Sequence, residues 1–93
     1  SPEDAARREC VEESGWEPGP LHLLHRFHPI AGQSTQTFWL FGATTATEVG
    51  EPEGEETDRV EWHDDVAVAG IVERGEVLDG LSVIALLRHL STR

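Results

Sequence analysis

Residues 8–16 decide how this chain is interpreted, and they read RECVEESGW. In an α-helix, at ~100° per residue, Glu9, Glu12 and Glu13 fall within an arc of about 100°. Gathered carboxylate oxygens are the ligands that a hard divalent cation such as Mg²⁺ prefers, and this ion usually keeps waters and substrate phosphates as well. Gly15 supplies the positive φ that favours a helix C-terminus. The stretch therefore predicts a short helix that presents a face of carboxylates.

A basic residue stands beside this acidic group. Arg8 lies one turn before Glu12, so its guanidinium can hold a carboxylate by a bidentate contact. The alternative interpretation is a plain solvated surface, because acidic triplets on helices usually face water.

The bulk composition restricts the classes of partner. The 93 residues include 18 acidic and 7 basic side chains, with a net charge of −11. This balance argues against binding to nucleic acid or to an anionic membrane by charge. The chain shows neither an apolar run of bilayer length nor a signal segment. Its single cysteine, Cys10, has no partner for an internal disulfide, and we expect a cytoplasmic location.

Local signals predict the order of the elements. Ser1, followed by Pro2, is a typical cap for the first helix. Asp64 or His63 lies near the start of a second helix, which Gly75 ends, and Asp79 caps a third. We expect a helix over residues 1–14, a turn over 17–20, strands over 21–28 and 37–47, an acidic loop over 48–57, a short strand over 59–62, and helices over 64–74 and 80–90. Strands flanked by packed helices indicate an α/β sandwich.

Two further patterns concern three histidines and the last predicted helix. His22, His25 and His28 would converge on a metal only in a helix, and in a strand His25 points away from the other two. The last helix carries an apolar face, formed by Leu81, Ile84, Leu87 and Leu90.

The order of residues 8–16 resembles the second half of the Nudix box: arginine, glutamate, apolar, any residue, two glutamates, any residue, glycine, apolar. The resemblance implies a Nudix-type α/β/α sandwich with a mixed sheet, as a single domain over residues 1–93. The glutamate that opens the first half of the box would fall just before Ser1, and the chain contains no methionine. We therefore expect an N-terminally truncated domain, the C-terminal two thirds of the usual fold.

Features beyond the box resemble the ADP-ribose pyrophosphatase branch of that family. The segment 28–32 reads HPIAG and lies where this branch carries a proline-x-proline-glycine loop, with Ala31 in place of the second proline. The acidic segment 53–56 resembles the loop that carries the general base, and residues 75–87 look like the C-terminal helix of the branch.

The resemblance implies a role for each candidate residue. Glu9, Glu12 and Glu13 are the expected ligands of Mg²⁺, for which Mn²⁺ is an alternative, and Arg8 orients a carboxylate. The acidic loop is expected to supply the general base. Glu56 or Glu55 is the preferred candidate, and Glu53 is the next.

The expected reaction is hydrolysis of the pyrophosphate in a nucleoside diphosphate derivative, with ADP-ribose giving AMP and ribose 5-phosphate. The alternatives are another nucleoside diphosphate sugar or a nucleoside triphosphate as substrate, a non-catalytic domain that senses a nucleotide, and an acidic interaction module. Members of the branch commonly dimerise, so a homodimer is a candidate assembly.

Overall fold

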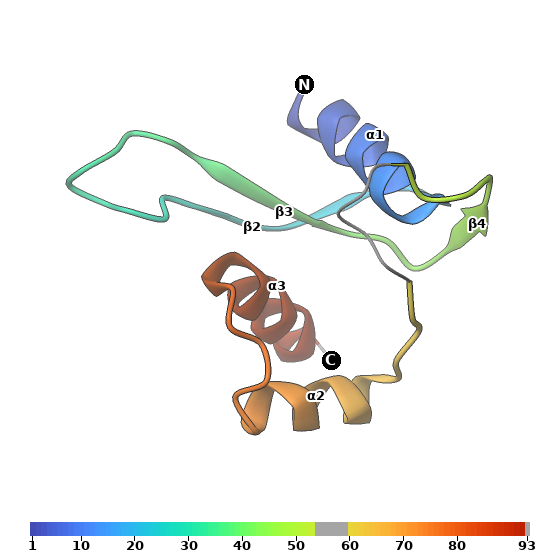
Figure 1. Cartoon of the computed structure of the whole chain (residues 1–93). Helices are drawn as coiled ribbons and strands as arrows, with labels where there is room; N and C mark the ends of the chain where they lie inside the picture. The colour runs from blue at the N-terminus through green and yellow to red at the C-terminus, as the bar shows by residue number, and fades with distance from the viewer. Residues whose placement is uncertain (54–59, 93) are drawn as a thin grey trace. The chain divides into compact units, whose positions relative to one another are not determined.

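The computed structural model describes residues 1–53 and 60–92, which contain three helices and four strands (Figure 1). The chain divides into two compact units. The first contains Ser1–Leu23 and Phe41–Glu61, and the second contains Leu24–Leu40 and Trp62–Arg93. Both helices and strands are present, so the predicted α/β class is confirmed. A single domain over residues 1–93 stays a prediction.

Helix α1 spans Pro2–Ser14, as the local signals predict. The Ser1 hydroxyl accepts a hydrogen bond from the Asp4 amide at 3.1 Å, and acidic residues fill the first turn, where the helix dipole favours them. Gly15 ends the helix at φ +76°, and its amide donates to the Val11 carbonyl at 2.8 Å.

The exposure of side chains along α1 follows the helical period. One side is half-buried and the other is exposed, and helix α1 makes its contacts with strand β1. The half-buried side includes Arg7, Cys10, Val11 and Ser14, and the exposed side includes Arg8, Glu9, Glu12 and Glu13.

Strand β1 (Trp16–Pro18) overlaps the segment 17–20 for which only a turn was predicted, so that prediction was wrong for residues 17 and 18. β1 pairs antiparallel with β4 (Ala46–Glu48), with Trp16 opposite Glu48 and Pro18 opposite Ala46. A proline is tolerated here because it is the last residue of a short strand in a two-stranded sheet. Beyond it, the Gly19 amide donates to the Thr45 carbonyl at 2.8 Å.

A second two-stranded sheet pairs β2 (His22–Phe27) with β3 (Phe38–Gly42). The predicted strand over 37–47 is broken, because β3 ends at Gly42 and β4 begins at Ala46 in the other sheet. Aromatic residues hold the β2–β3 pair: the Phe27 and Phe38 rings stack with centroids 5.8 Å apart. On these strands the Arg26 guanidinium lies 5.4 Å from the ring centroid of Trp39.

Helices α2 (Asp65–Glu73) and α3 (Gly80–Ser91) confirm the two predicted C-terminal helices. Asp64 caps α2 by accepting from the Ala67 amide at 2.8 Å. Asp79 caps α3 and accepts from both the amide and the hydroxyl of Ser82, which lowers the pKa of Asp79 below its ordinary value.

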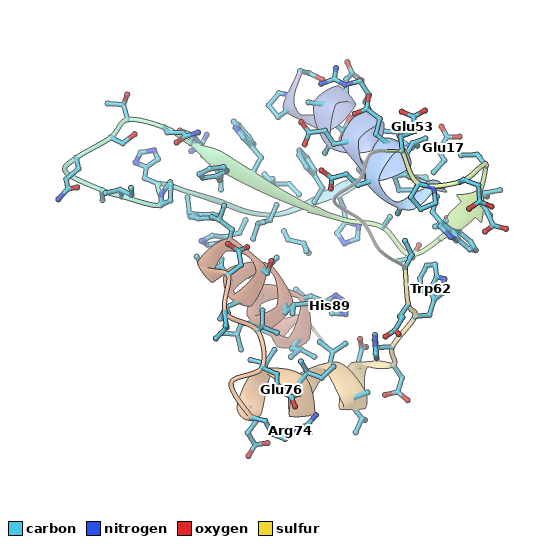
Figure 2. The ribbon with its side chains drawn as sticks, in the orientation of Figure 1. Glu17, Glu53, Trp62, Arg74, Glu76 and His89 are labelled. Carbon is cyan, nitrogen blue, oxygen red and sulfur yellow. The ribbon has the colours of Figure 1, made fainter. Side chains whose placement is uncertain are left out.

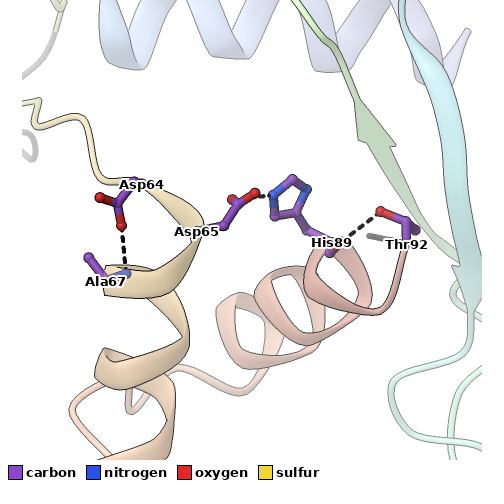
Figure 3. A network of polar contacts seen from close by, with 5 residues as sticks. All are labelled: Asp64, Asp65, Ala67, His89 and Thr92. Atoms are coloured by element: carbon purple, nitrogen blue, oxygen red, sulfur yellow. Dashed lines mark hydrogen bonds and ion pairs between the residues drawn. The ribbon is translucent and has the colours of Figure 1, made fainter.

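An ion pair connects α2 with α3 (Figure 3). Asp65 Oδ1 lies 2.8 Å from His89 Nε2, while the Thr92 hydroxyl caps the His89 carbonyl at 2.6 Å. Arg88 Nε donates to the Leu24 carbonyl at 3.0 Å and so connects α3 with β2.

One prediction for the C-terminal part was wrong. Residues 60–62 form no strand, and residue 59 lies outside the described part. On α3, three members of the predicted apolar face are exposed, with Leu81 at 38%, Ile84 at 37% and Leu87 at 50%. The fourth member, Leu90, is half-buried, as are Val83, Ala85 and Leu86. Apolar residues occupy more than one side of this helix, so their spacing alone did not reveal which side packs.

Within residues 1–53 and 60–92, no large apolar side chain is fully buried. A search of the described helices finds none of the length and apolar character that crossing a membrane requires.

Candidate active site

Helix α1 presents the predicted metal ligands on its exposed side. Glu9, Glu12 and Glu13 are all exposed, on the side away from the half-buried residues that face β1. Arg8 Nε lies 3.8 Å from Glu12 Oε1, so the two side chains form an ion pair through a single nitrogen–oxygen contact, and the bidentate contact stays a prediction. Both side chains are about half exposed or more, at 65% and 48%, so the pair contributes little to stability, and a role for Arg8 in orienting the carboxylate stays a prediction.

The three glutamates fit a hard cation by the chemistry of their donor atoms. Among residues 1–53 and 60–92, however, no group of three histidine, cysteine, aspartate or glutamate side chains is arranged to hold a metal. The carboxylates share one helix face, and their exposed side chains can change rotamer. Their assignment as a ligand set stays a prediction.

The placement of these carboxylates is electrostatically unfavourable. Glu12 and Glu13 lie in the last turn of α1, which contains no basic residue, where the negative end of the helix dipole disfavours carboxylates. Glu9 and Glu13 are four residues apart, a spacing at which like charges repel. A cation bound on this face would relieve both effects.

The acidic loop reaches this helix through its main chain. The Glu53 amide donates to the Glu12 carbonyl at 2.6 Å, and Figure 2 labels Glu53 beside α1. The Gly15 carbonyl accepts from the Val49 amide at 2.8 Å and from the Gly50 amide at 3.2 Å. The segment 49–53 is therefore hydrogen-bonded to the C-terminal end of α1.

These bonds place one of the three predicted base residues. The hydrogen bond from its amide to the Glu12 carbonyl places Glu53 beside Glu12. Glu55 and Glu56, which were preferred as the base, lie outside the described residues.

Gly15 makes this approach of the segment 49–53 sterically feasible. A Cβ added at Gly15 would lie 2.2 Å from the Gly50 carbonyl oxygen, far inside van der Waals contact. Ser14 supports the same corner, because its hydroxyl donates to the Cys10 carbonyl at 2.6 Å and accepts from the Trp16 amide at 3.1 Å.

Arg7 is a residue whose contacts the sequence analysis missed. Its guanidinium donates through Nη1 to the Pro18 carbonyl and through Nη2 to the Gly19 carbonyl, the latter at 3.0 Å. The helical period places Arg7 on the inner face of the helix, one turn before Cys10 and Val11. A charged side chain on that face needs hydrogen-bond partners, so its position could have predicted such contacts.

The 28–32 segment and the tryptophans Trp39 and Trp62 belong to the second unit of the chain. Residues 32–35 of the loop after the 28–32 segment line a cavity of about 550 Å³, without any carboxylate. Trp39 is 39% exposed, with the Arg26 guanidinium 5.4 Å from its ring centroid, and Trp62 is 70% exposed.

The comparison with protein families adds an independent finding. A family model described as NUDIX domain matches residues 1–78, which is most of the chain and includes α1, all four strands and α2. The search of curated proteins finds no match. The extent of the family match, together with the glutamates of α1, shows that the chain belongs to the NUDIX domain family.

Proposed function

We propose that this chain is a Mg²⁺-dependent hydrolase that cleaves the pyrophosphate of a nucleoside diphosphate derivative, with ADP-ribose as the favoured substrate. Membership of the NUDIX family indicates a hydrolase of nucleoside diphosphate-linked compounds in general, and such enzymes generally use a divalent metal. The observation that carries the proposal is the hydrogen bond from the Glu53 amide to the Glu12 carbonyl, which holds Glu53 beside a helix whose exposed side carries three glutamates.

Charge explains why a cation belongs in this proposal. The chain has a net charge of −11, and a pyrophosphate would be repelled by the carboxylates of α1. Glu9, Glu12 and Glu13 would hold Mg²⁺, or Mn²⁺ in its place, on that face. When bound, the metal supplies charge neutralisation at the phosphates and lowers the pKa of a ligated water.

The protein groups have separate tasks in the proposed hydrolysis. Arg8 orients the Glu12 carboxylate. A glutamate of the acidic loop, Glu56 or Glu55 with Glu53 behind them, accepts a proton from the attacking water. The water oxygen then forms a bond to one phosphorus while the bridging P–O bond breaks, which gives AMP and ribose 5-phosphate from ADP-ribose.

The test is release of AMP from ADP-ribose by the purified chain in Mg²⁺, with Mn²⁺ in parallel. ADP-glucose, dinucleoside polyphosphates and nucleoside triphosphates serve as competing substrates. Selective, metal-dependent release of AMP supports the ADP-ribose assignment. Faster turnover of another substrate would replace it within the same reaction class.

Glu12→Gln removes one carboxylate charge from the metal face, so turnover should fall by roughly 100-fold or more. The matched control is Glu73→Gln, the same change at an exposed residue at the end of α2, and turnover should stay within about twofold of wild type. Far-UV circular dichroism checks that both variants are folded. Equal activity of the two variants would refute the assignment of α1 as the metal site.

A folded chain that binds ADP-ribose without releasing AMP would instead be a nucleotide-sensing domain. A chain that shows no thermal shift with Mg²⁺ and no nucleotide binding would be an acidic interaction module. Homodimerisation and a cytoplasmic location are part of the proposal and are tested separately, by light scattering and by microscopy of a tagged chain.

A further inference from the structure

Arg7 connects the inner face of α1 with the turn that follows β1. The inner face is otherwise formed by small or apolar residues and Ser14, and on an ideal helix Arg7 lies about 170° from the mean direction of the three glutamates. Its half-buried guanidinium therefore cannot serve the metal face directly. Both of its acceptors are main-chain carbonyls, of Pro18 and Gly19.

The β1–β4 pair has two anchors on α1, one at each end. At the end formed by Trp16 and Glu48, the chain continues directly from α1 through Gly15, whose carbonyl accepts the amides of Val49 and Gly50. At the opposite end, where Pro18 faces Ala46, the anchor is the side chain of Arg7. Without Arg7 the strand pair would lose its hydrogen bonds to α1 at the Pro18 end, and would keep those at the Gly15 end and the packing of β1 on α1.

The segment 49–53 follows directly from β4, and its amides also bond to the carbonyls of Gly15 and Glu12, so its position depends on both the strand pair and α1. Its last described residue is Glu53, whose amide returns to the Glu12 carbonyl at 2.6 Å. A change in the angle between α1 and the strand pair would therefore alter the position of Glu53 relative to Glu12. This is the distance between the acidic loop and the carboxylate face on which the proposed chemistry depends.

We infer that Arg7 is a positioning residue that fixes the β1–β4 pair on α1 and thereby sets the segment 49–53, which ends at Glu53, against the carboxylate face of α1. The expected effect on turnover rests on the proposed function. The expected effect on the position of Glu53 does not, because it can be measured without turnover. A planar guanidinium suits the task because its fork donates to two adjacent carbonyls at once, which a lysine ammonium cannot reproduce with the same geometry.

The first measurement is amide hydrogen exchange of the full chain, by NMR, for wild type, Arg7→Met and Arg7→Lys. Arg7→Met keeps the length of the side chain and removes both hydrogen bonds. Exchange of the Glu53 amide should accelerate by about tenfold, while that of the Gly15 amide, which bonds to Val11 within the helix end, should change by less than about threefold. Arg7→Lys should give an intermediate acceleration at Glu53.

The second measurement is steady-state kinetics with ADP-ribose. Misplacement of the acidic loop lowers kcat, by about 100-fold for Arg7→Met, while KM and the Mg²⁺ concentration for half-maximal rate stay within about threefold of wild type. The matched control is Arg74→Met, which removes an exposed ion pair with Glu76 outside the first unit and should leave both measurements unchanged.

Equal acceleration of the Glu53 and Gly15 amides would overturn the inference, because it would show that Arg7 contributes only to general stability. An unchanged kcat for folded Arg7→Met would overturn it as well. If wild type releases no AMP from any substrate, the proposed function fails, and the selective exchange of the Glu53 amide alone decides whether Arg7 positions the loop.

Discussion

Replacement of Gly15 by alanine tests the corner at which α1, β1 and the segment 49–53 meet. The Gly15 backbone has φ +76°, a conformation that costs an alanine about 1 kcal/mol. The new Cβ would also lie 2.2 Å from the Gly50 carbonyl oxygen, so the segment 49–53 must move away. That movement endangers the two hydrogen bonds from Val49 and Gly50 to the Gly15 carbonyl.

The expected cost follows from these terms. Each lost hydrogen bond costs about 1 kcal/mol, and together with the backbone term the loss is about 3 kcal/mol. For a domain of this size, that corresponds to a fall in Tm of roughly 12 to 24 °C. The free energy of unfolding is measured by urea titration, followed by circular dichroism and by tryptophan fluorescence.

Two glycine variants separate the contributions. Gly75 has φ +72° but nothing within 4 Å of an added Cβ, so Gly75→Ala should cost only the backbone term of about 1 kcal/mol. Gly50 has no positive φ and also no neighbour within 4 Å, so Gly50→Ala should be neutral or slightly stabilising. A cost for Gly15→Ala no greater than that for Gly75→Ala would refute the close approach of the segment 49–53 to α1.

Two further predictions concern the caps of the C-terminal helices. Asp64→Ala removes the acceptor for the Ala67 amide and should lower the free energy of unfolding by about 1 kcal/mol, measured by urea titration. Asp64→Asn keeps a capping oxygen and should retain most of the wild-type stability. Equal losses in both variants would contradict the capping role. The hydrogen bonds from Ser82 lower the pKa of Asp79 in the folded state. The ionised Asp79 therefore contributes to stability above the pKa of aspartate in the unfolded chain, about 3.9. This contribution is lost as the pH falls through the lower pKa of the folded state. Thermal melts between pH 2 and 6 should show a smaller loss at low pH for Asp79→Asn than for wild type, and identical profiles would contradict the shift.

The sequence alone determined the elements that depend on neighbours a few residues apart. The start of α1 at Ser1, its end at Gly15 and the cap at Asp79 use contacts within one helical turn, and local residue types specify them. The same holds for the carboxylate face, because the helical period fixes which residues share a side. The residue pattern 8–16 carried the family resemblance, and the NUDIX match over residues 1–78 confirms the family.

Only the tertiary structure decided the features that join distant parts of the chain. Residues 16–18 form a strand because residues 46–48 pair with them, and no local signal in a proline-glycine segment specifies that partner. Three other features likewise depend on partners that residue types do not specify. They are the packed side of α3, the contact of Arg7 with residues 18 and 19, and the hydrogen bond from Glu53 to Glu12. Hydrogen-bond and packing partners far apart in sequence are set by the folded chain as a whole, whereas helix caps and faces are set within a turn.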